Sequence, residues 1–266
     1  AKIVVFPELC ITGYTCNDLF LQELLLEKAK EALLTIAEET GQLETLFLVG
    51  LPVDKDGRLY NVAAVLYRGR ILGMIPKKNI PMYAEFYEGR HFTPGEETVT
   101  EYRLGKQVIP FGSNLLFRCE ELPELILGCE LCEDLWVAEP PSTSHALMGA
   151  TVIANLSASN ETVSKDDYRT LLIKASSARL LCGYIYTSAG EGESTQDLVF
   201  GGHDLIAENG TLLVQSARFT TGILYTDLDV LKISSERRRM GTFGKRPMKP
   251  YLTVPFSMQL TGTKLD

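Results

Sequence analysis

Short apolar runs and one long amphipathic segment alternate through the first part of the chain. Apolar and β-branched residues fill positions 2–6, 46–51 and 125–127, and each run ends at proline, glycine or a polar turn, which is typical of buried strands. Leu and Ala recur at helical spacing between Asp18 and Gly41, and Asp18 is the expected N-cap. The pattern predicts a strand–helix–strand unit at the start of the chain.

The pattern continues with hairpins and further strand–helix units. Arg68-Gly69-Arg70 lies between two apolar runs and predicts a hairpin, and Asn209-Gly210 is a second turn signal. The predicted helices cover 142–149 and 164–181. The predicted strands cover 62–67, 71–75, 151–156, 184–188, 199–206, 212–216 and 222–228, with a strand pair over 108–117. Strand–helix alternation mixed with hairpins predicts an α/β fold with a mixed sheet.

Two segments depart from these patterns. Residues 78–95 form a long predicted loop rich in aromatic side chains, and such loops are more often functional than filler, although core or interface packing is the simpler explanation for most of these rings. Beyond about Glu236 the chain is irregular and contains several Gly and Pro. We therefore expect one domain over 1–235 and an extended arm over 236–266. The chain begins inside a predicted strand, without Met, which suggests a fragment.

Composition narrows the class of protein. The 266 residues are 45% hydrophobic, enough for one large domain with a full core. The net charge of −8 argues against a nucleic-acid partner, and the single basic cluster, 237–239, is a better candidate for a solvated or interface segment. Six cysteines without a repeated framework indicate a reducing, cytoplasmic setting. No apolar run approaches the ~18 residues that a membrane-spanning helix needs.

Cys132 stands out because carboxylates surround it in the stretch 128–136, directly after a predicted strand. Structural cysteines usually lie among apolar neighbours, so we hypothesise that Cys132 is a nucleophile. A half-buried cysteine at a strand end is the alternative. Cys129 and Cys132 form a C-x-x-C, but no second ligand pair accompanies it, so we predict no metal site and assign Cys129 to the core.

Glu8, Lys77 and Cys132 share one property, since each lies just past the C-terminal end of a predicted strand. Functional sites of open α/β sheets gather outside those ends. A thiol that attacks a carbonyl, a carboxylate that takes its proton and an ammonium that stabilises the oxyanion make a coherent set. A neighbouring lysine also lowers the pKa of a thiol. Lys77 and Lys78 point opposite ways on an extended segment, so only one of them can face the site.

Three motifs resemble the signatures of the nitrilase superfamily: residues 6–9 (FPEL), 76–81 (PKKNIP) and 130–134 (ELCED). Four longer segments are similar to the glutaminase domain of glutamine-dependent NAD+ synthetases, namely 6–20, 83–92, 154–159 and 189–197. The resemblance implies a nitrilase-type α-β-β-α sandwich with mixed sheets. It also implies that the strand and helix which open the family domain precede the first residue of this sequence.

The resemblance implies a role for each matching residue. Glu8 corresponds to the general base, Lys77 to the oxyanion-stabilising lysine and Cys132 to the nucleophile that forms a thioester. Glu88 matches the supporting glutamate that orients this triad. The positions that match substrate-binding residues are Tyr83, Glu133, Ser159 and Lys165.

The expected activity is hydrolysis of the glutamine amide, with ammonia passed to a synthetase domain in cis. The Ser-Gly-Gly pyrophosphatase loop of that domain is absent from this sequence, and Gly201-Gly202 lacks its serines. ATP and Mg are therefore implied only for the synthetase domain, and no cofactor is expected here. Homo-oligomerisation is also expected. The alternatives are a stand-alone amidase acting on another small amide and a truncated chain that contributes only an interface.

Overall fold

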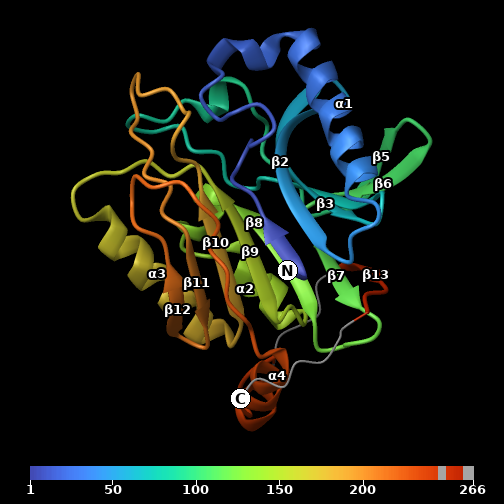
Figure 1. Ribbon diagram of the computed structural model, residues 1–266, viewed down its shortest axis with the longest axis vertical. Helices are drawn as coiled ribbons and strands as arrows, with labels where there is room; N and C mark the ends of the chain where they lie inside the picture. Colours follow the sequence, from blue (N-terminus) through green and yellow to red (C-terminus); the bar gives the residue numbers. More distant parts are fainter. Residues whose placement is uncertain (245–249, 260–266) are drawn as a thin grey trace.

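The computed structural model describes residues 1–244 and 250–259, which build two facing sheets between outer helices (Figure 1). The first sheet is six-stranded and mixes parallel with antiparallel pairs. Its spatial order is β1 (Ile3–Val5), β2 (Leu46–Lys55), β3 (Arg58–Tyr67), β4 (Arg70–Pro76), β6 (Gln107–Phe111) and β5 (Thr100–Leu104).

The second sheet is seven-stranded and has a parallel centre, β8–β9–β10, with antiparallel pairs beside it. Its spatial order is β12 (Thr211–Gln215), β11 (Leu205–Glu208), β10 (Gly183–Ser188), β9 (Val152–Ser157), β8 (Ile126–Leu131), β7 (Leu115–Cys119) and β13 (Leu252–Phe256). Strands in the parallel centre of a sheet are buried on both faces, and nearly every residue of β8 and β9 is buried, including the polar ones.

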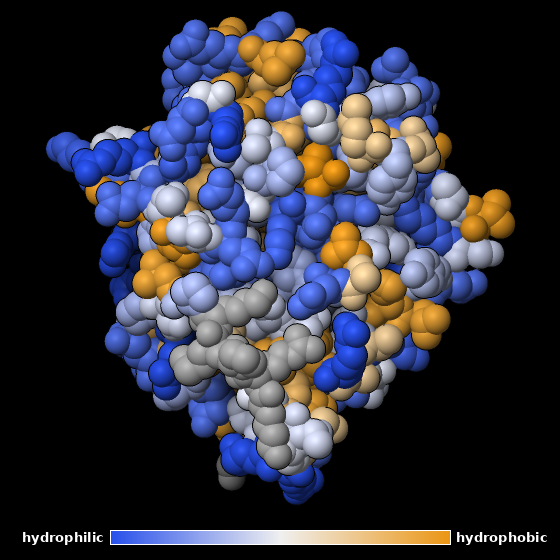
Figure 2. Space-filling view, turned by 180° about the vertical axis from the view of Figure 1, so that it is seen from behind, coloured by the Kyte–Doolittle hydropathy of each residue, from blue (hydrophilic) through white to orange (hydrophobic). Residues whose placement is uncertain are grey.

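The hydrophobic core lies in three layers. Inward-facing residues of both sheets, such as Leu48 and Leu127, form one cluster between the sheets. The outer face of the first sheet packs against α1 (Glu23–Glu39) through Leu33 and Ala37. The outer face of the second sheet packs against α2 (Pro141–Leu147) and α3 (Lys165–Leu180). The predicted α-β-β-α sandwich with mixed sheets is therefore confirmed. On the face opposite to that of Figure 1, apolar side chains are interspersed among polar ones (Figure 2).

The turns follow from residues that tolerate a left-handed backbone. Arg68 and Gly69 have φ of 46° and 76°, and they join β3 to β4 in the predicted hairpin. Asn209 and Gly210 (φ 46° and 87°) join β11 to β12, also as predicted. Two consecutive residues with positive φ match the twist of the flanking strands, which keeps these hairpins tight.

The helix start at Asp18 was predicted wrongly. Residues Asn17–Leu21 form a short 3-10 helix, η1, and α1 begins only at Glu23, without a side-chain cap. The Asp18 carboxylate instead accepts hydrogen bonds from Arg90 at 2.8 and 2.9 Å. A partner distant in the sequence has therefore replaced the local backbone donors that an N-cap would satisfy.

Three strand predictions also need correction. The predicted strand 199–206 is a regular strand only over 205–206, because β11 covers 205–208, and residues 222–228 form no strand. Ile223 and Tyr225 alternate as a strand would, but they are exposed and no neighbouring strand pairs with them. The expected pair within 108–117 is divided, because β6 pairs with β5 in the first sheet and β7 with β8 in the second.

The segment expected to be an extended arm contributes to the fold. Helix α4 (Val230–Arg239) continues past residue 236, and β13 pairs in parallel with β7 at the edge of the second sheet. The Arg237 guanidinium donates to carbonyls at the ends of α2 and α3, including Ala150 and Leu181. The division of the chain at residue 235 stays a prediction.

Gly50 in β2 lies against the backbone that follows β1. An added Cβ would lie 2.3 Å from the backbone nitrogen of Leu9 and 2.9 Å from the carbonyl carbon of Glu8. Backbone atoms cannot yield as a flexible side chain does, so only glycine allows this close approach.

We predict that Gly50→Ala lowers the free energy of unfolding by about 2 kcal/mol or more, because the methyl group pushes residues 7–9 away from β2. Urea unfolding of both proteins measures this change. Gly222→Ala is the matched control, since no atom lies within 4 Å of the added Cβ, and it should leave the stability nearly unchanged. Equal stabilities of all three proteins would contradict the role given to Gly50.

Candidate active site

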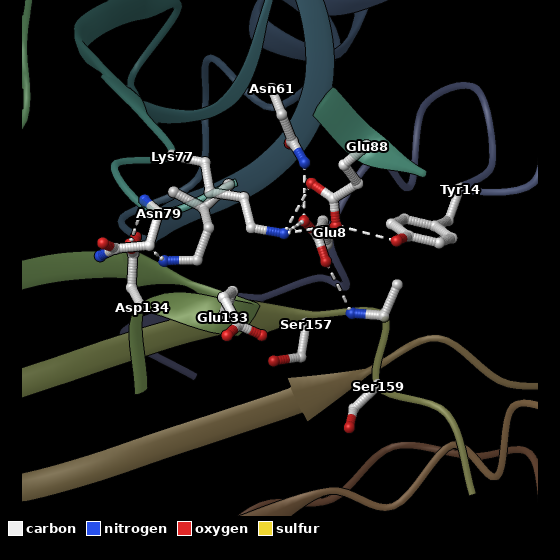
Figure 3. Close-up of polar contacts among 12 residues, drawn as sticks. Glu8, Tyr14, Asn61, Lys77, Asn79, Glu88, Glu133, Asp134, Ser157 and Ser159 are labelled. Atoms are coloured by element: carbon white, nitrogen blue, oxygen red, sulfur yellow. Dashed lines mark hydrogen bonds and ion pairs between the residues drawn. The ribbon is translucent and has the colours of Figure 1, made fainter. Parts of the chain in front are cut away.

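Three strand ends from the two sheets meet at one place. Glu8 follows β1, Lys77 follows β4, and Cys132 is the first residue after β8, where it opens the 3-10 helix η3 (Cys132–Leu135). A hydrogen bond of 3.2 Å from the backbone nitrogen of Glu8 to the backbone oxygen of Ser157 joins the first sheet to the end of β9. Figure 3 shows Glu8 and Lys77 side by side near Glu133, the residue after the cysteine, and the charges of Glu8 and Lys77 both act on the Cys132 thiol.

A fully buried ion cluster occupies this junction. The Lys77 Nζ donates to Glu8 Oε1 at 2.7 Å and to the two carboxylate oxygens of Glu88 at 2.6 and 2.8 Å. Glu8 and Lys77 are completely inaccessible to solvent, and Glu88 is nearly so. Figure 3 shows the lysine pointing between the two glutamates. Lys78 turns the other way and pairs with Glu97 nearer the surface, so the structure brings Lys77 alone to these carboxylates.

The charges of this cluster depend on one another. Burial by itself would lower the pKa of the Lys77 ammonium, but Glu8 and Glu88 outweigh burial and raise it well above its usual range. Burial raises the pKa of Glu88 to about 6, against the opposing charge of Lys77. The lysine therefore stays protonated, and it remains a fixed positive charge at the bottom of the site.

Hydrogen bonds to both oxygens hold the Glu8 carboxylate in place. Asn61 Nδ2 donates to Oε1 at 2.6 Å, and the backbone N–H of Ala158 donates to Oε2 at 2.9 Å. Tyr14 donates its hydroxyl to Glu88 Oε1 at 2.8 Å from the opposite side. These three supporting residues were missed in the sequence, because each lies far along the chain from the group that it orients.

Cys132 sits on a strained turn. Its φ of 38° lies in the left-handed region, which a residue with a Cβ adopts only at an energetic cost. Asp134 supports the turn by accepting hydrogen bonds from the Leu131 backbone at 3.1 Å and the Asn79 backbone at 2.8 Å. The same carboxylate thereby ties the cysteine turn to the segment that follows Lys77.

The resting thiol of Cys132 is neutral. Burial and the Glu8 charge raise its pKa to about 12, while Lys77 lowers it. Lys77 thus acts in the expected direction, but desolvation and two carboxylates exceed the effect of one ammonium on the pKa of the thiol. A protonated thiol can attack a carbonyl only if a base removes its proton during attack, and Glu8 contributes to the electrostatic field at the sulfur.

The residues expected to bind substrate lie around this cysteine. Tyr83 donates its hydroxyl to the Glu133 carboxylate at 2.9 Å, and Glu133 directly follows the cysteine. Lys165 lies 5.1 Å from the Trp136 ring centroid and donates to Asn160 Oδ1. Burial lowers the pKa of Lys165, and the cysteine opposes this shift, so the two groups interact electrostatically. Ser159 is buried next to Ala158, the residue that contacts Glu8.

The second cysteine of the C-x-x-C has a structural place. Cys129 is buried in the cluster between the two sheets, as the sequence predicted. Within residues 1–244 and 250–259, no three His, Cys, Asp or Glu side chains are grouped so that they could hold a metal ion. The same residues contain no helix with the length and apolar character needed to cross a bilayer.

An α-β-β-α sandwich with a buried lysine–carboxylate cluster beside a cysteine is the arrangement that the nitrilase resemblance implied. Comparison with known proteins agrees, since the carbon-nitrogen hydrolase family model matches residues 1–238. The chain belongs to the carbon-nitrogen hydrolase family.

The relatives narrow the resemblance further. A glutamine-dependent NAD(+) synthetase of Mycobacterium tuberculosis is 45% identical over 245 residues, which cover 91% of this chain and 36% of the relative. A crystal structure of a glutamine-dependent NAD(+) synthetase from Cytophaga hutchinsonii superposes with a TM-score of 0.73 at 30% identity, over 82% of this chain and 35% of that chain. This chain therefore spans little more than a third of the length of such relatives.

Shorter proteins share the same fold. A carbon-nitrogen hydrolase from Helicobacter pylori superposes with a TM-score of 0.72 at 19% identity, and the match covers 95% of this chain and 88% of that chain. At this identity the likeness supports the architecture alone. Together with the family match, it confirms the nitrilase-type fold expected from the sequence.

Glu130 is a buried carboxylate outside the ion cluster. It lies on the helix-covered side of β8, where it accepts hydrogen bonds from the Ser142 backbone at 2.7 Å and from the Tyr184 hydroxyl. Burial raises its pKa to about 7, although both hydrogen bonds oppose this shift. The folded chain therefore holds a proton on Glu130 at pH values where the unfolded chain has released it.

We predict that part of the stability falls as the pH rises from about 4.3, the ordinary pKa of a glutamate, to about 7, the pKa of folded Glu130. Below this window both states are protonated, and above it the loss is complete. Glu130→Gln stays neutral throughout, so it should reduce the drop in unfolding free energy between about pH 5 and about pH 8 by up to about 3 kcal/mol. Urea unfolding at both pH values measures the drop, and an identical drop in both proteins would refute the assignment.

Proposed function

We propose that this chain is the glutaminase part of a glutamine-hydrolysing NAD+ synthetase. Cys132 would form a thioester with the side-chain carbonyl of glutamine, and the released ammonia would serve an amidation reaction on a synthetase domain. The observation that supports this most directly is the buried Glu8–Lys77–Glu88 cluster beside Cys132. The likeness to glutamine-dependent NAD(+) synthetases selects glutamine from the amides on which such a cluster can act.

Acylation follows from the charges of the site. As the Cys132 sulfur attacks the amide carbon, its proton passes to Glu8, which the neutral state of the thiol requires. The Lys77 ammonium stabilises the oxyanion that develops on the amide oxygen, in a site with little solvent. Glu8 then gives the proton to the amide nitrogen, the C–N bond breaks and ammonia leaves the thioester.

Hydrolysis of the thioester uses the same groups in reverse. Glu8 takes a proton from a water molecule, whose oxygen attacks the thioester carbon, and the proton returns to the sulfur as the C–S bond breaks. Glutamate leaves and the thiol is restored. Glu88 takes no proton in this sequence, since its role is to hold Lys77 against Glu8.

Recognition of the amino-acid end is assigned to the charged residues around the cysteine. Glu133, oriented by Tyr83, would pair with the α-ammonium group of glutamine. Lys165 and Ser159 would contact the α-carboxylate and the carbon chain. Lys165 is suited to this because the rings of Trp136 and Phe86 limit its motion and burial reduces its hydration.

The remaining parts of the whole protein also belong to this proposal. ATP and Mg would act on the synthetase domain. The match covers 36% of the relative, so the rest of its length could hold such a domain. A homo-oligomer would help to enclose the path from Cys132 to that domain, so that ammonia is not protonated in bulk water.

Glutamate release from a panel of amides tests the reaction. We expect glutamine to be hydrolysed at least tenfold faster than asparagine or short aliphatic amides, and Cys132→Ala to abolish hydrolysis, since no thioester can form. A diazo-ketone analogue of glutamine should label Cys132 in the wild-type protein. Equal rates on all amides would favour a stand-alone amidase, and absence of label on folded protein would favour a purely structural chain.

The pairing of Glu133 with the α-ammonium group predicts a change in KM. Glu133→Gln should raise KM for glutamine by about 10- to 100-fold, as expected for loss of one charge-assisted hydrogen bond, with a much smaller effect on kcat. Tyr83→Phe should raise KM less, because the carboxylate remains. Glu39→Gln, an exposed substitution on α1, is the matched control. An unchanged KM in Glu133→Gln would exclude this residue from substrate binding.

A further inference from the structure

Arg169 is a fully buried cation that the chemistry described so far does not use. It lies in α3, one turn after Lys165, and its side chain is completely inaccessible to solvent. A buried guanidinium is costly unless its charge is paired and its donors are satisfied. The two terminal nitrogens of Arg169 have partners, and most of these belong to one short segment, 159–161, which begins two residues after β9. Its Nε has no hydrogen-bond partner among the described residues.

The contacts of Arg169 fix both the backbone and the side chains of that segment. NH2 donates to Ser159 Oγ at 3.3 Å and to the Asn160 carbonyl at 3.1 Å, and NH1 donates to Glu161 Oε1 at 2.7 Å. A guanidinium has only donors, so Ser159 Oγ must accept from it. The Ser159 side chain also interacts with the Tyr186 hydroxyl, so the serine is held from two sides.

His203 contacts the Arg169 guanidinium as well. Its Nδ1 lies 3.0 Å from Arg169 NH1, and because arginine cannot accept, Nδ1 carries no proton in this arrangement. Burial and the charge of Arg169 lower the pKa of His203, which favours the same neutral form. Glu161 is also buried and forms a second, longer ion pair with Arg218 at 3.8 Å. The planar guanidinium is thus held in one orientation.

Segment 159–161, which Arg169 holds, is connected to the residues around Cys132 in two ways. At its start, Ala158 donates its backbone N–H to Glu8 Oε2 at 2.9 Å. At Asn160, the side chain accepts from Lys165 and donates to Glu85, which ties α3 to the loop that carries Tyr83. A displacement of Asn160 would therefore move Lys165 and leave the Ser159 hydroxyl without a fixed direction.

We propose that Arg169, held by Glu161 and His203, is a positioning residue that fixes Ser159, Asn160 and Lys165 for binding the amino-acid end of the substrate. The proposal rests on the glutaminase function proposed above and adds to it. Arg169 itself touches no substrate atom. Its effect is to keep Ser159 and Lys165 at a set separation, so its loss affects recognition of the amino acid more than the chemistry at Cys132.

The decisive variant is Arg169→Lys, which keeps the charge and the pairing with Glu161 but cannot reach Ser159, Asn160 and His203 together. We expect KM for glutamine to rise about tenfold, which corresponds to loss of one hydrogen bond from the bound amino acid, while kcat falls less than about threefold. The rate at which iodoacetamide alkylates Cys132 should stay within about twofold, because the ion cluster is unchanged. Arg179→Lys, an exposed substitution in the same helix, should match the wild type in every measurement.

A His203 pair provides the second test if Arg169→Lys does not fold. His203→Asn can keep an acceptor for Arg169, so its KM for glutamine should stay near that of the wild type. His203→Leu removes the acceptor and should raise the KM severalfold. A purely structural clamp would lower the melting temperature without changing KM, and that result would overturn the proposal. A wild-type protein that hydrolyses no glutamine would instead refute the proposed function, so the two failures are distinguishable.

Discussion

The ammonium group of Lys77, removed from water and held between two carboxylates, is the constraint on which the rest of the site depends. Removing this charge from solvent is costly, and Glu8 and Glu88 at 2.6–2.8 Å compensate it. Glu8 must therefore stay where β1 ends, and Glu88 must stay at the start of η2 (Glu88–Arg90). The ends of β1 and β4 and the loop over 78–95 are therefore held together by one shared charge.

A second consequence of this cluster is the state of the nucleophile. With one lysine against two carboxylates, the negative charges prevail and the Cys132 thiol keeps its proton at rest. In the proposed reaction, attack is coupled with proton transfer, and a carboxylate fixed by Asn61 and Ala158 is suited to that task. The electrostatics thus favour general-base assistance over a preformed thiolate.

The elements with a strong periodic pattern and the residues at strand ends could be predicted from the sequence. The strand at 151–156 and the helix at 164–181 were predicted nearly to their limits, because burial alone determines their patterns. The strand predicted at 222–228 was wrong. Alternation of apolar and polar residues shows a tendency to form a strand, but it does not show whether a partner strand is present. Tyr14, Asn61 and Arg169 were missed for a related reason, as their partners are close only in the folded chain.

The neutral, enclosed sulfur has a consequence for the life of the protein between reactions. Peroxides oxidise thiolates far more readily than thiols, and they need access to the sulfur. Cys132 offers neither a resting anion nor an exposed surface, since it is 5% accessible and its pKa is raised to about 12. The burial and the negative charges that keep the thiol protonated therefore also protect it from oxidants.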